Sequence, residues 1–171
     1  MNDHSNHLGG HPHHDFVRDA VIVKSPYRIS LGGGGTDLPF YFQERGGLLI
    51  SASINQYMTV SAAARGLDDK FFIQTTFTQS AEKLDELTHD IIREALRYFD
   101  VQKGFQVATY STLPTATGLG ASSTLMVALV SALNLLKGNV VGPWEVAKEA
   151  HHVERGILGL EGGVQDQYIA A

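Results

Sequence analysis

The first half of the chain alternates between short apolar, β-branched stretches and polar or glycine-rich breaks. Stretches of about four to eight residues with this composition are typical of β-strands. The pattern predicts a strand that continues past Pro26, then two strands that pair with each other after a Gly-Gly turn, and then one rich in aromatic side chains. These strands span residues 20–24, 28–31, 48–54, 57–64 and 70–76. A short helix is expected from Leu38, capped by Thr36 or Asp37.

Helical spacing replaces this alternation from Thr88 onward. Apolar side chains recur every three or four residues up to Phe99, with Thr88 as the expected cap, and one more strand follows at 104–111. Residues 122–136 form the strongest predicted helix, which is apolar on most of its circumference and is therefore expected to be buried. A last helix is predicted to begin at Pro143 and to run through Ile157. Strands followed by helices indicate an α+β domain of two layers.

A chain of 171 residues with 43% hydrophobic and 18% charged side chains has the size and composition of one folded domain. Its net charge is −5 and its 13 Lys and Arg residues are scattered, whereas nucleic-acid binding requires clustered positive charge. The absence of cysteine excludes disulfides, Cys-based zinc sites and thiol catalysis. No apolar run reaches the roughly 18–20 residues that span a bilayer, and no signal peptide is evident. We therefore expect a cytoplasmic protein whose partners include neither nucleic acid nor a membrane.

Residues 1–19 carry five of the eight histidines among Asn, Ser, Gly and Pro, and they offer little to bury. This composition fits either a metal-binding tract or a disordered leader. The disordered leader is favoured, because chain ends that bury nothing are rarely ordered. The domain is therefore expected to span residues 20–171.

Residues 114–123 (PTATGLGASS) lie between a predicted strand and the buried helix. Gly118 and Gly120 allow close approach of the backbone to a ligand, and the N–H groups that begin the next helix favour an anion. The hydroxyls of Ser122 and Ser123 suit a phosphate oxygen or a metal ion. The segment lacks the Gly-Lys-Ser/Thr of a Walker loop, so a phosphate cradle and a tight turn capped by serine both remain open.

Residues 26–37 (PYRISLGGGGTD) form a second glycine-rich segment. A predicted strand delivers Arg28, four glycines follow, and Asp37 then begins a helix. Arg28 and Asp37 can thus flank one cavity, where the first donates and the second accepts hydrogen bonds. Four consecutive glycines are costly in chain entropy, which indicates a ligand or a packing role, with a flexible loop as the alternative.

Residues 154–167 (ERGILGLEGGVQDQ) place Glu154 near the end of a helix and Asp166 beyond a glycine turn. One carboxylate suits a metal ligand and the other a general base, and the alternative is that both are solvated charges. Nearby, His151 and His152 do not have the H-E-x-x-H spacing of a zinc helix, so we interpret them as a helix-surface pair.

In order and spacing, these three segments resemble the motifs of the GHMP kinases, the superfamily of galactokinase, homoserine kinase and mevalonate kinase. The first motif, GGGTD at 33–37 followed by a Gly-Gly-bearing strand at 46–48, is most similar to that of the bacterial D-glycero-D-manno-heptose 7-phosphate kinases. Residues 162–171 (GGVQDQYIAA) also look like that branch. The resemblance implies a ribosomal-protein-S5-like α+β domain, followed in the family by a ferredoxin-like second domain.

The resemblance also implies ATP-dependent phosphoryl transfer to a sugar hydroxyl with Mg²⁺. It makes Asp166 the catalytic base with Arg28 beside it. It makes Ser122 and Glu154 the magnesium ligands, although the family's spacing from this Glu to the Asp is one residue shorter. The cradle for ATP is implied at Pro114, Gly118, Leu119, Gly120, Ala121, Ser122 and Ser123. Contacts to the sugar are implied at Gly34, Gly35, Thr36, Asp37 and Gly163.

Two departures from the family pattern matter. The chain lacks the family's third glycine-rich motif and ends well before the family's usual length, so we interpret it as an N-terminal half that is inactive alone. Without the second domain an apolar face would be exposed and would promote self-association, for example as a homodimer. In addition, Gly34 and Gly35 replace the Glu-His of galactokinase, which makes room for a bulkier or phosphorylated sugar.

The expected acceptor is therefore heptose 7-phosphate, phosphorylated at its anomeric hydroxyl. Arg45, Arg65 and Lys70 are the cationic candidates for its phosphate. The alternatives are a kinase of another sugar, such as fucose or galactose, and a non-catalytic module that keeps a nucleotide or sugar pocket without turnover. A decarboxylase of the same superfamily is disfavoured by the sugar-type first motif.

Overall fold

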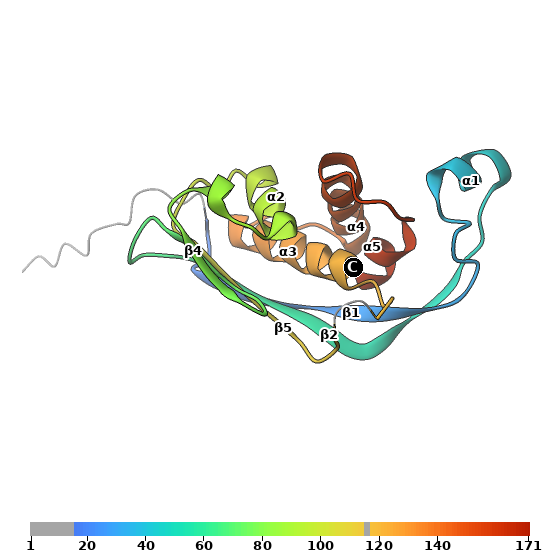
Figure 1. Ribbon diagram of the computed structural model, residues 1–171, viewed down its shortest axis with the longest axis horizontal. Coiled ribbons are helices and arrows are strands. Elements are labelled where there is room, and N and C mark those ends of the chain that lie inside the picture. The colour runs from blue at the N-terminus through green and yellow to red at the C-terminus, as the bar shows by residue number, and fades with distance from the viewer. Residues whose placement is uncertain (1–15, 115–116) are drawn as a thin grey trace, which may run out of the picture.

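The computed structural model describes residues 16–114 and 117–171, so the His-rich residues 1–15 and residues 115–116 of the glycine-rich segment lie outside it. One five-stranded sheet carries helices on one face (Figure 1). All neighbouring strands pair antiparallel except β3 and β5, which run parallel. The strands are β1 (Ala20–Gly32), β2 (Ile50–Ala64), β3 (Phe71–Gln74), β4 (Thr78–Ala81) and β5 (Phe105–Ser111), in the spatial order β1-β2-β5-β3-β4. The predicted α+β fold of two layers is confirmed.

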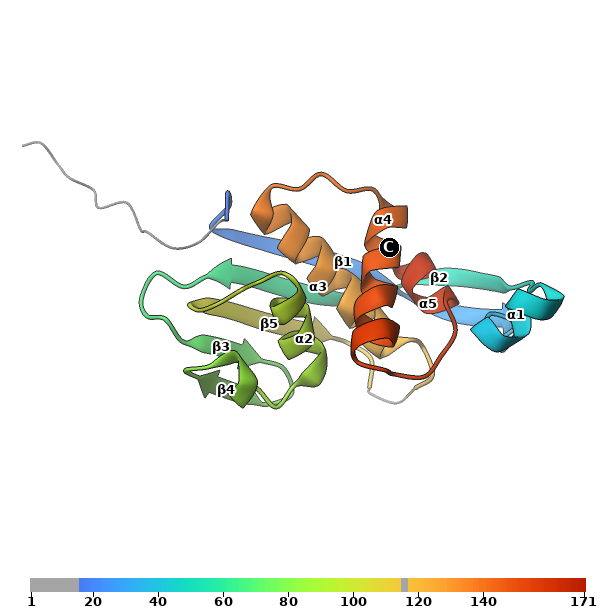
Figure 2. The same cartoon turned by 90° about the horizontal axis from the view of Figure 1, so that it is seen from above.

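The second layer is made of helices from the later part of the chain (Figure 2). The first helix stands apart from this layer, in a lobe at the far end of the β1–β2 pair. No helix in the described part of the chain is long and apolar enough to cross a membrane. The helices are α1 (Pro39–Arg45), α2 (Asp90–Tyr98), α3 (Ala121–Lys137), α4 (Pro143–His151) and α5 (Gln165–Ala170), with a 3-10 turn (Leu84–Glu86) and the π-helix η2 (His152–Ile157) that continues α4.

The core forms around α3, which packs between the sheet and the other helices. Met126, Leu129 and Leu133 have no exposed surface, and both ends of the helix are bounded by glycines in left-handed geometry, Gly120 and Gly138. A helix that is apolar on most of its circumference must be covered on most sides, and α3 is. The helix predicted at 122–136 is confirmed.

The β1–β2 pair differs from the sequence prediction. The structure has one strand of 15 residues, β2, where two strands that pair with each other are predicted. The predicted continuation of the first strand past Pro26 is confirmed, because β1 is one strand of 13 residues. Pro26 lies opposite Tyr57 and Arg28 opposite Ser53, so the register of the two strands shifts directly after the proline. Because β1 is an edge strand, a residue without an N–H group is tolerated there.

The predicted cap of α1 is also wrong. The N-cap residue is Leu38, and no side chain caps the helix. The Thr36 hydroxyl instead donates to the carbonyl oxygens of Gly33 and Leu48, at 2.7 and 3.1 Å. The carboxylate of Asp37 faces α5 and accepts hydrogen bonds outside the helix. Both polar side chains therefore close the glycine-rich turn rather than begin the helix.

The helix predicted from Thr88 begins at Asp90, with His89 as its N-cap residue. The Thr88 hydroxyl lies 3.0 Å from the side-chain oxygen of Gln79, to which it donates. The helix predicted from Pro143 is present as α4, but its last part is the π-helix η2. Strand β4 and helix α5 are additional elements that the sequence pattern does not predict.

Replacing Leu129 by Ala should lower the free energy of unfolding by about 2–5 kcal/mol, because it removes buried methyl groups and leaves a cavity. Leu135 on the same helix is 41% exposed, so Leu135→Ala is the matched control and should cost less than about 1 kcal/mol. Urea denaturation followed by circular dichroism measures both values. An equal loss in the two variants would contradict the position of α3 in the core.

Candidate active site

Strand β1 and helix α5 bring Arg28 and Asp166 into contact. The Nε of Arg28 donates to Oδ1 of Asp166 at 2.7 Å, and Nη2 lies 2.6 Å from the same oxygen. The Nη1 of Arg28 donates to the carbonyl oxygen of Gly118 at 2.7 Å. Both side chains are largely buried, so salt screens this ion pair little. One guanidinium therefore connects the strand, the glycine loop and α5.

The glycine loop approaches this ion pair closely. Gly118 and Gly120 have φ values of +72° and +77°, and Gly120 is the N-cap residue of α3. A Cβ at Gly120 would lie 3.0 Å from Oδ2 of Asp166 and 3.5 Å from Cζ of Arg28. Both the left-handed backbone and the lack of space require glycine here. The N–H groups that begin α3, which have no partner within the helix, consequently lie next to the ion pair.

A second polar cluster lies behind the start of α3. Ser122 and Ser123 donate to the same carboxylate oxygen, Oε1 of Glu154, at 2.9 and 3.0 Å. The other oxygen, Oε2, accepts from the amide of Gln167 at 2.7 Å. Glu154 has no exposed surface, and the Arg155 guanidinium lies 3.5 Å from Oε1. The carboxylate is therefore buried with donors on both oxygens, as a buried charge requires.

Asp37 lies against the N-terminus of α5. Its Oδ2 accepts from the backbone N–H of Gln165 at 3.2 Å, and its Oδ1 accepts from the N–H of Gly35 at 3.2 Å. A Cβ on Gly163 would lie 1.7 Å from Asp37 Oδ2, so only glycine leaves room for this carboxylate. Asp37 is 5% exposed. Asp37 thus connects the first glycine-rich segment to the first residue of α5.

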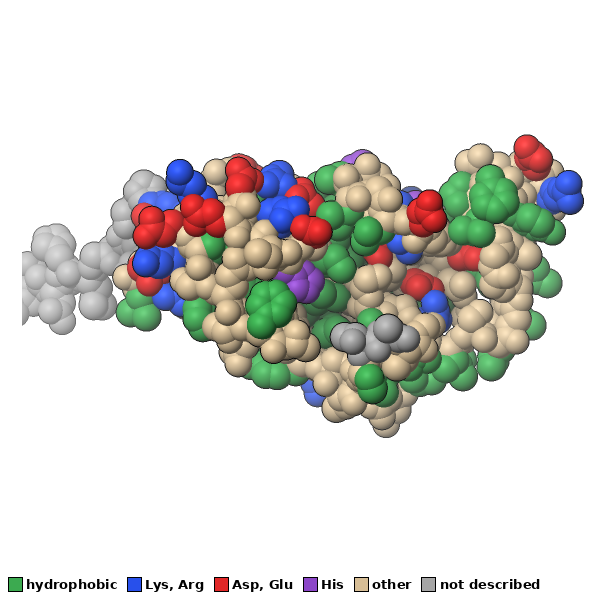
Figure 3. Space-filling model, viewed as in Figure 1, with side chains coloured by type: hydrophobic (Ala, Val, Ile, Leu, Met, Phe, Trp, Pro, Cys, Tyr) green, Lys and Arg blue, Asp and Glu red, His purple; other side chains and the backbone are tan. Residues whose placement is uncertain are grey.

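A cavity of 990 Å³ lies in front of the Arg28–Asp166 pair. Phe77, His89 and Tyr110 also line it, and burial lowers the pKa of the His89 imidazole. Acidic and basic side chains are visible in the hollowed surface between the helices and the α1 lobe (Figure 3). The predicted site residues that line the cavity are Arg28, Pro114, Gly118, Gly120, Ala121, Ser122 and Asp166. Its size suits a nucleotide or a ligand of similar volume.

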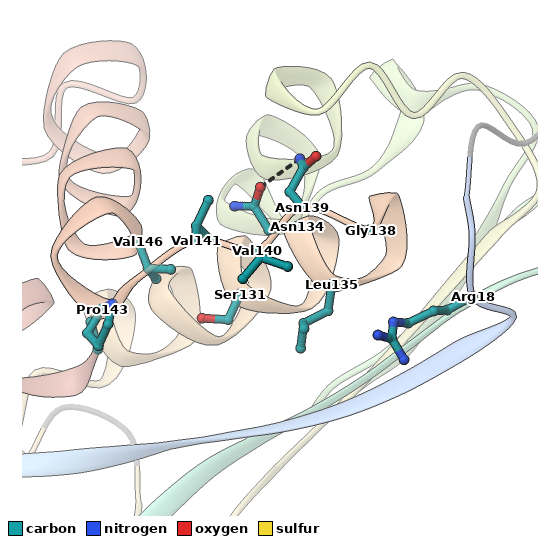
Figure 4. A pocket seen from close by; sticks show the side chains of 11 residues that line it. Arg18, Ser131, Asn134, Leu135, Gly138, Asn139, Val140, Val141, Pro143 and Val146 are labelled. Carbon is teal, nitrogen blue, oxygen red and sulfur yellow. Dashed lines mark hydrogen bonds between the residues drawn. The ribbon is translucent and has the colours of Figure 1, made fainter.

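A smaller cavity of 270 Å³ lies at the other end of α3 (Figure 4). It is lined by Arg18, Leu135 and Val146, and by Asn134 and Asn139, whose side chains share a hydrogen bond of 2.9 Å. None of the predicted site residues lines it. The predicted Arg28–Asp166 pair and the glycine loop line the 990 Å³ cavity instead.

A model of the family described as GHMP kinases N terminal domain matches residues 86–171, just over half of the chain. The chain belongs to the GHMP kinase family. It is 33% identical to the D-glycero-alpha-D-manno-heptose 7-phosphate kinase of Campylobacter jejuni over 88% of this chain and 48% of that protein. It is 30% identical to the mevalonate kinase of Thermococcus sibiricus over 84% of this chain and 47% of that protein.

The same similarity holds in three dimensions. The crystal structure of a D-glycero-D-manno-heptose 1-phosphate kinase from Bacteroides thetaiotaomicron matches with a TM-score of 0.79 at 31% identity, over 88% of this chain and 53% of that one. The chain thus spans about half the length of the curated relatives it matches. The resemblance inferred from the three motifs is confirmed at the level of family and fold.

The GHMP kinase domain contains polar site residues that the sequence analysis missed. Gln167 joins Glu154 to Ser123, and Arg155 donates to the backbone carbonyl oxygens of Leu160 and Glu161. The signal available for Gln167 was its place directly after Asp166. A buried amide cannot be distinguished from an exposed one by its sequence neighbours alone, because its burial depends on the docking of α5.

The donor set of the GHMP kinase domain fits one magnesium ion. Mg²⁺ prefers oxygen ligands and is usually held through one or two carboxylates together with substrate phosphates and water. Ser122 presents a hydroxyl oxygen at the cavity wall, and Glu154 lies directly behind it. Among residues 16–114 and 117–171 no three His, Cys, Asp or Glu side chains gather into a metal site of their own. An ion at Ser122 would therefore need phosphate oxygens to complete its ligands.

Gly163→Ala should lower the free energy of unfolding by about 1–3 kcal/mol, because the added methyl group would occupy the space of the Asp37 carboxylate. Gly32→Ala is the control, since its Cβ would meet no atom within 4 Å and its φ is not left-handed. That variant should stay within about 0.5 kcal/mol of the parent protein. Chemical denaturation compares the two, and a neutral Gly163→Ala would disprove the tight contact with Asp37.

Proposed function

We propose that this domain forms the catalytic, ATP-binding half of a sugar kinase that transfers the γ-phosphoryl group of Mg·ATP to heptose 7-phosphate, at its anomeric hydroxyl. In this proposal the glycine loop and the start of α3 bind the phosphates, Asp166 is the base, and Asp37 belongs to the acceptor side. The proposed partners are thus ATP, Mg²⁺ and a sugar phosphate.

The contact of Arg28 with Asp166 at the glycine loop carries this proposal. Arg28 holds Oδ1 of Asp166 with two donors, while no hydrogen bond within the described part of the chain ends on Oδ2. Oδ2 is also the oxygen nearest to Gly120, and both residues line the 990 Å³ cavity. A carboxylate with one oxygen held and the other available is suited to accept a proton from a hydroxyl group.

In the proposed step, Oδ2 of Asp166 accepts the proton of the sugar hydroxyl while the hydroxyl oxygen attacks the γ-phosphorus. The bond from that phosphorus to the bridging oxygen breaks, and ADP leaves with the electron pair. Arg28 keeps the carboxylate in place, and its charge stabilises the negative charge on the phosphoryl group in transfer. The unpaired N–H groups of Ala121 and Ser122 bind phosphate oxygens. Ser122, with Glu154 behind it, would hold Mg²⁺, whose positive charge would offset the negative charge of the phosphates.

The choice of a phosphorylated heptose rests on the first glycine segment and on the relatives. A Cβ at Gly34 would meet only the Ser30 hydroxyl, at 3.6 Å, and one at Gly35 would meet nothing within 4 Å. The segment therefore leaves open space where galactokinase has Glu-His. Two similar proteins are named for heptose phosphates, one as a 7-phosphate kinase and one as a 1-phosphate kinase.

Only one of the three expected cationic candidates lies near this segment. Arg65 is paired with Asp68, and Lys70 lies 3.6 Å from Glu82. Arg65 also lies far from Arg28 along the sheet. It comes twelve residues after Ser53, which pairs with Arg28, and twelve residues of a strand extend over about 40 Å at about 3.3 Å per residue. Arg45, in the last turn of α1, is in the lobe that the glycine segment connects to β1. We therefore retain Arg45 and discard Arg65 and Lys70 as phosphate contacts.

Release of ADP from Mg·ATP by the purified full-length protein, with and without sugars, tests the proposal. Release that depends on heptose 7-phosphate is the expected result. Binding of ATP without turnover on any sugar of a panel that includes heptose, galactose and fucose would contradict it and would favour a non-catalytic module. A preference for a neutral sugar in kcat/KM would retain the kinase but overturn the acceptor.

Asp166→Asn should lower kcat by about 10²- to 10⁴-fold, because the amide cannot accept the hydroxyl proton. The affinity for Mg·ATP should change little, since the glycine loop and Ser122 are intact. Asp68→Asn is the control, because Asp68 also pairs with the Nε and Nη2 of an arginine, Arg65, but on an exposed surface and through both of its oxygens. Steady-state kinetics measure both variants. Retention of most of kcat in Asp166→Asn would refute the base assignment.

Gly34→Glu should impair the phosphorylated acceptor selectively. Gly34 tolerates a side chain, because its φ is not left-handed and its Cβ would make only an ordinary contact. A carboxylate about 4 Å from the sugar phosphate costs roughly 1–4 kcal/mol at effective dielectric constants of 80 to 20, or roughly 5- to 800-fold in kcat/KM. Gly34→Gln adds the same bulk without charge. Equal kcat/KM values for heptose 7-phosphate in the two variants would remove this charge argument.

A further inference from the structure

The side chain of Gln167 is completely buried beside the proposed metal site. It follows Asp166 directly in α5. Its amide nitrogen donates to Oε2 of Glu154 at 2.7 Å and to the Ser123 hydroxyl at 3.2 Å. One amide group therefore spans η2, which carries Glu154, and the first turn of α3, which carries Ser123.

The orientation of this amide is determined by the charge beside it. Rotating it by half a turn would place its carbonyl oxygen against the Glu154 carboxylate, so the nitrogen must face Glu154. Its carbonyl oxygen then has no hydrogen-bond partner in the described part of the chain, although it is buried. An unsatisfied buried acceptor costs about 1–3 kcal/mol. This cost offsets part of what the amide contributes through its hydrogen bonds to Glu154 and Ser123.

The effect of Gln167 on the site passes through Glu154. Ser122 donates its single hydroxyl proton to Oε1 of Glu154, so its oxygen lone pairs remain for a ligand in the cavity. This arrangement requires that Oε1, and not a rotated carboxylate, faces Ser122. Two groups besides the serines restrain that rotation, namely Gln167 at Oε2 and the Arg155 guanidinium 3.5 Å from Oε1. The bond from Gln167 is the shorter of the two.

We propose that Gln167 is a positioning residue for the metal site, which holds Glu154 so that the Ser122 hydroxyl oxygen faces the cavity. The inference rests on the proposed function, because it takes Ser122 and Glu154 as the magnesium site. It adds that α5 contributes to both sides of the proposed reaction, because Asp166 acts on the acceptor hydroxyl and Gln167 lies behind the metal site. Groups behind the ligands of a metal typically change metal affinity or activity by about 10- to 100-fold when they are lost.

The test is the binding of Mn²⁺, as a probe for Mg²⁺, to the full-length protein saturated with a non-hydrolysable ATP analogue. Electron paramagnetic resonance of free Mn²⁺, corrected for the Mn²⁺ that the analogue binds without protein, gives the dissociation constant without any turnover. Gln167→Met, which keeps most of the volume but loses both hydrogen bonds, should weaken Mn²⁺ by about 10- to 100-fold. The Mg²⁺ concentration for half-maximal activity should rise in parallel, while kcat at saturating Mg²⁺ recovers.

Asn134→Leu is the matched control. Asn134 is also a buried amide, and its nitrogen donates to Oε2 of Glu149 at 2.7 Å, far along α3 from the cavity. The two variants should lose similar thermal stability, but only Gln167→Met should lose metal affinity. If Gln167→Met does not fold, Gln167→Asn, which withdraws the amide by one methylene group, should give the same shift in Mn²⁺ binding.

The outcomes separate the two proposals. Unchanged Mn²⁺ affinity in a folded Gln167 variant would overturn the positioning role while leaving the kinase intact. Equal loss of Mn²⁺ affinity in Gln167→Met and Asn134→Leu would show that Gln167 acts only through the stability of the fold, and it would also overturn the positioning role. Failure of the parent protein to bind Mn²⁺ with the nucleotide analogue would overturn the proposed function and this inference together.

Discussion

The ion pair between Arg28 and Asp166 is the interaction on which the site depends. It joins three segments that are distant in sequence: the edge strand β1, the glycine loop through the carbonyl of Gly118, and the short helix α5. Such a pair adds little net stability, because removing two charges from water offsets most of their attraction. The ion pair instead defines the position of α5, because α5 must place Asp166 at the guanidinium of Arg28 to keep both charges paired. The geometry of the cavity follows from that docking.

Elements with local signals were predictable from the sequence, and those that depend on partners were not. Helix α3 is apolar on most of its circumference, and buried and exposed side chains alternate over the first residues of β5. Both elements were therefore predicted. The division of β2 into strands at 48–54 and 57–64 was an error, because Asn55 and Gln56 between them continue the strand beside a register shift of β1. Helix α5 has only six residues, and a helix of that length is formed by its packing rather than by its own propensity.

The site could be foreseen in outline for the same reason. The three glycine-rich or acidic segments contain Arg28, Ser122, Glu154 and Asp166, and the structure brings Arg28 to Asp166 and Ser122 to Glu154. The role expected for Asp37 remains a prediction, while the structure adds its contact with the backbone of α5. Glu154 lies within the π-helix η2, a kind of turn that is frequent at functional sites.

The brevity of α5 also has a consequence for the dynamics of the domain. Its six residues include Asp166, Gln167 and the backbone N–H of Gln165 that donates to Asp37, yet a helix this short has no stability of its own. Of the residues of α5, only Ala170 belongs to the buried hydrophobic core, most of which lies in α3 and the sheet. Opening of this one segment therefore costs less than global unfolding and breaks the contacts of Asp166 and Gln167 together. The arrangement of these side chains can be lost and regained as a local equilibrium while most of the core stays folded.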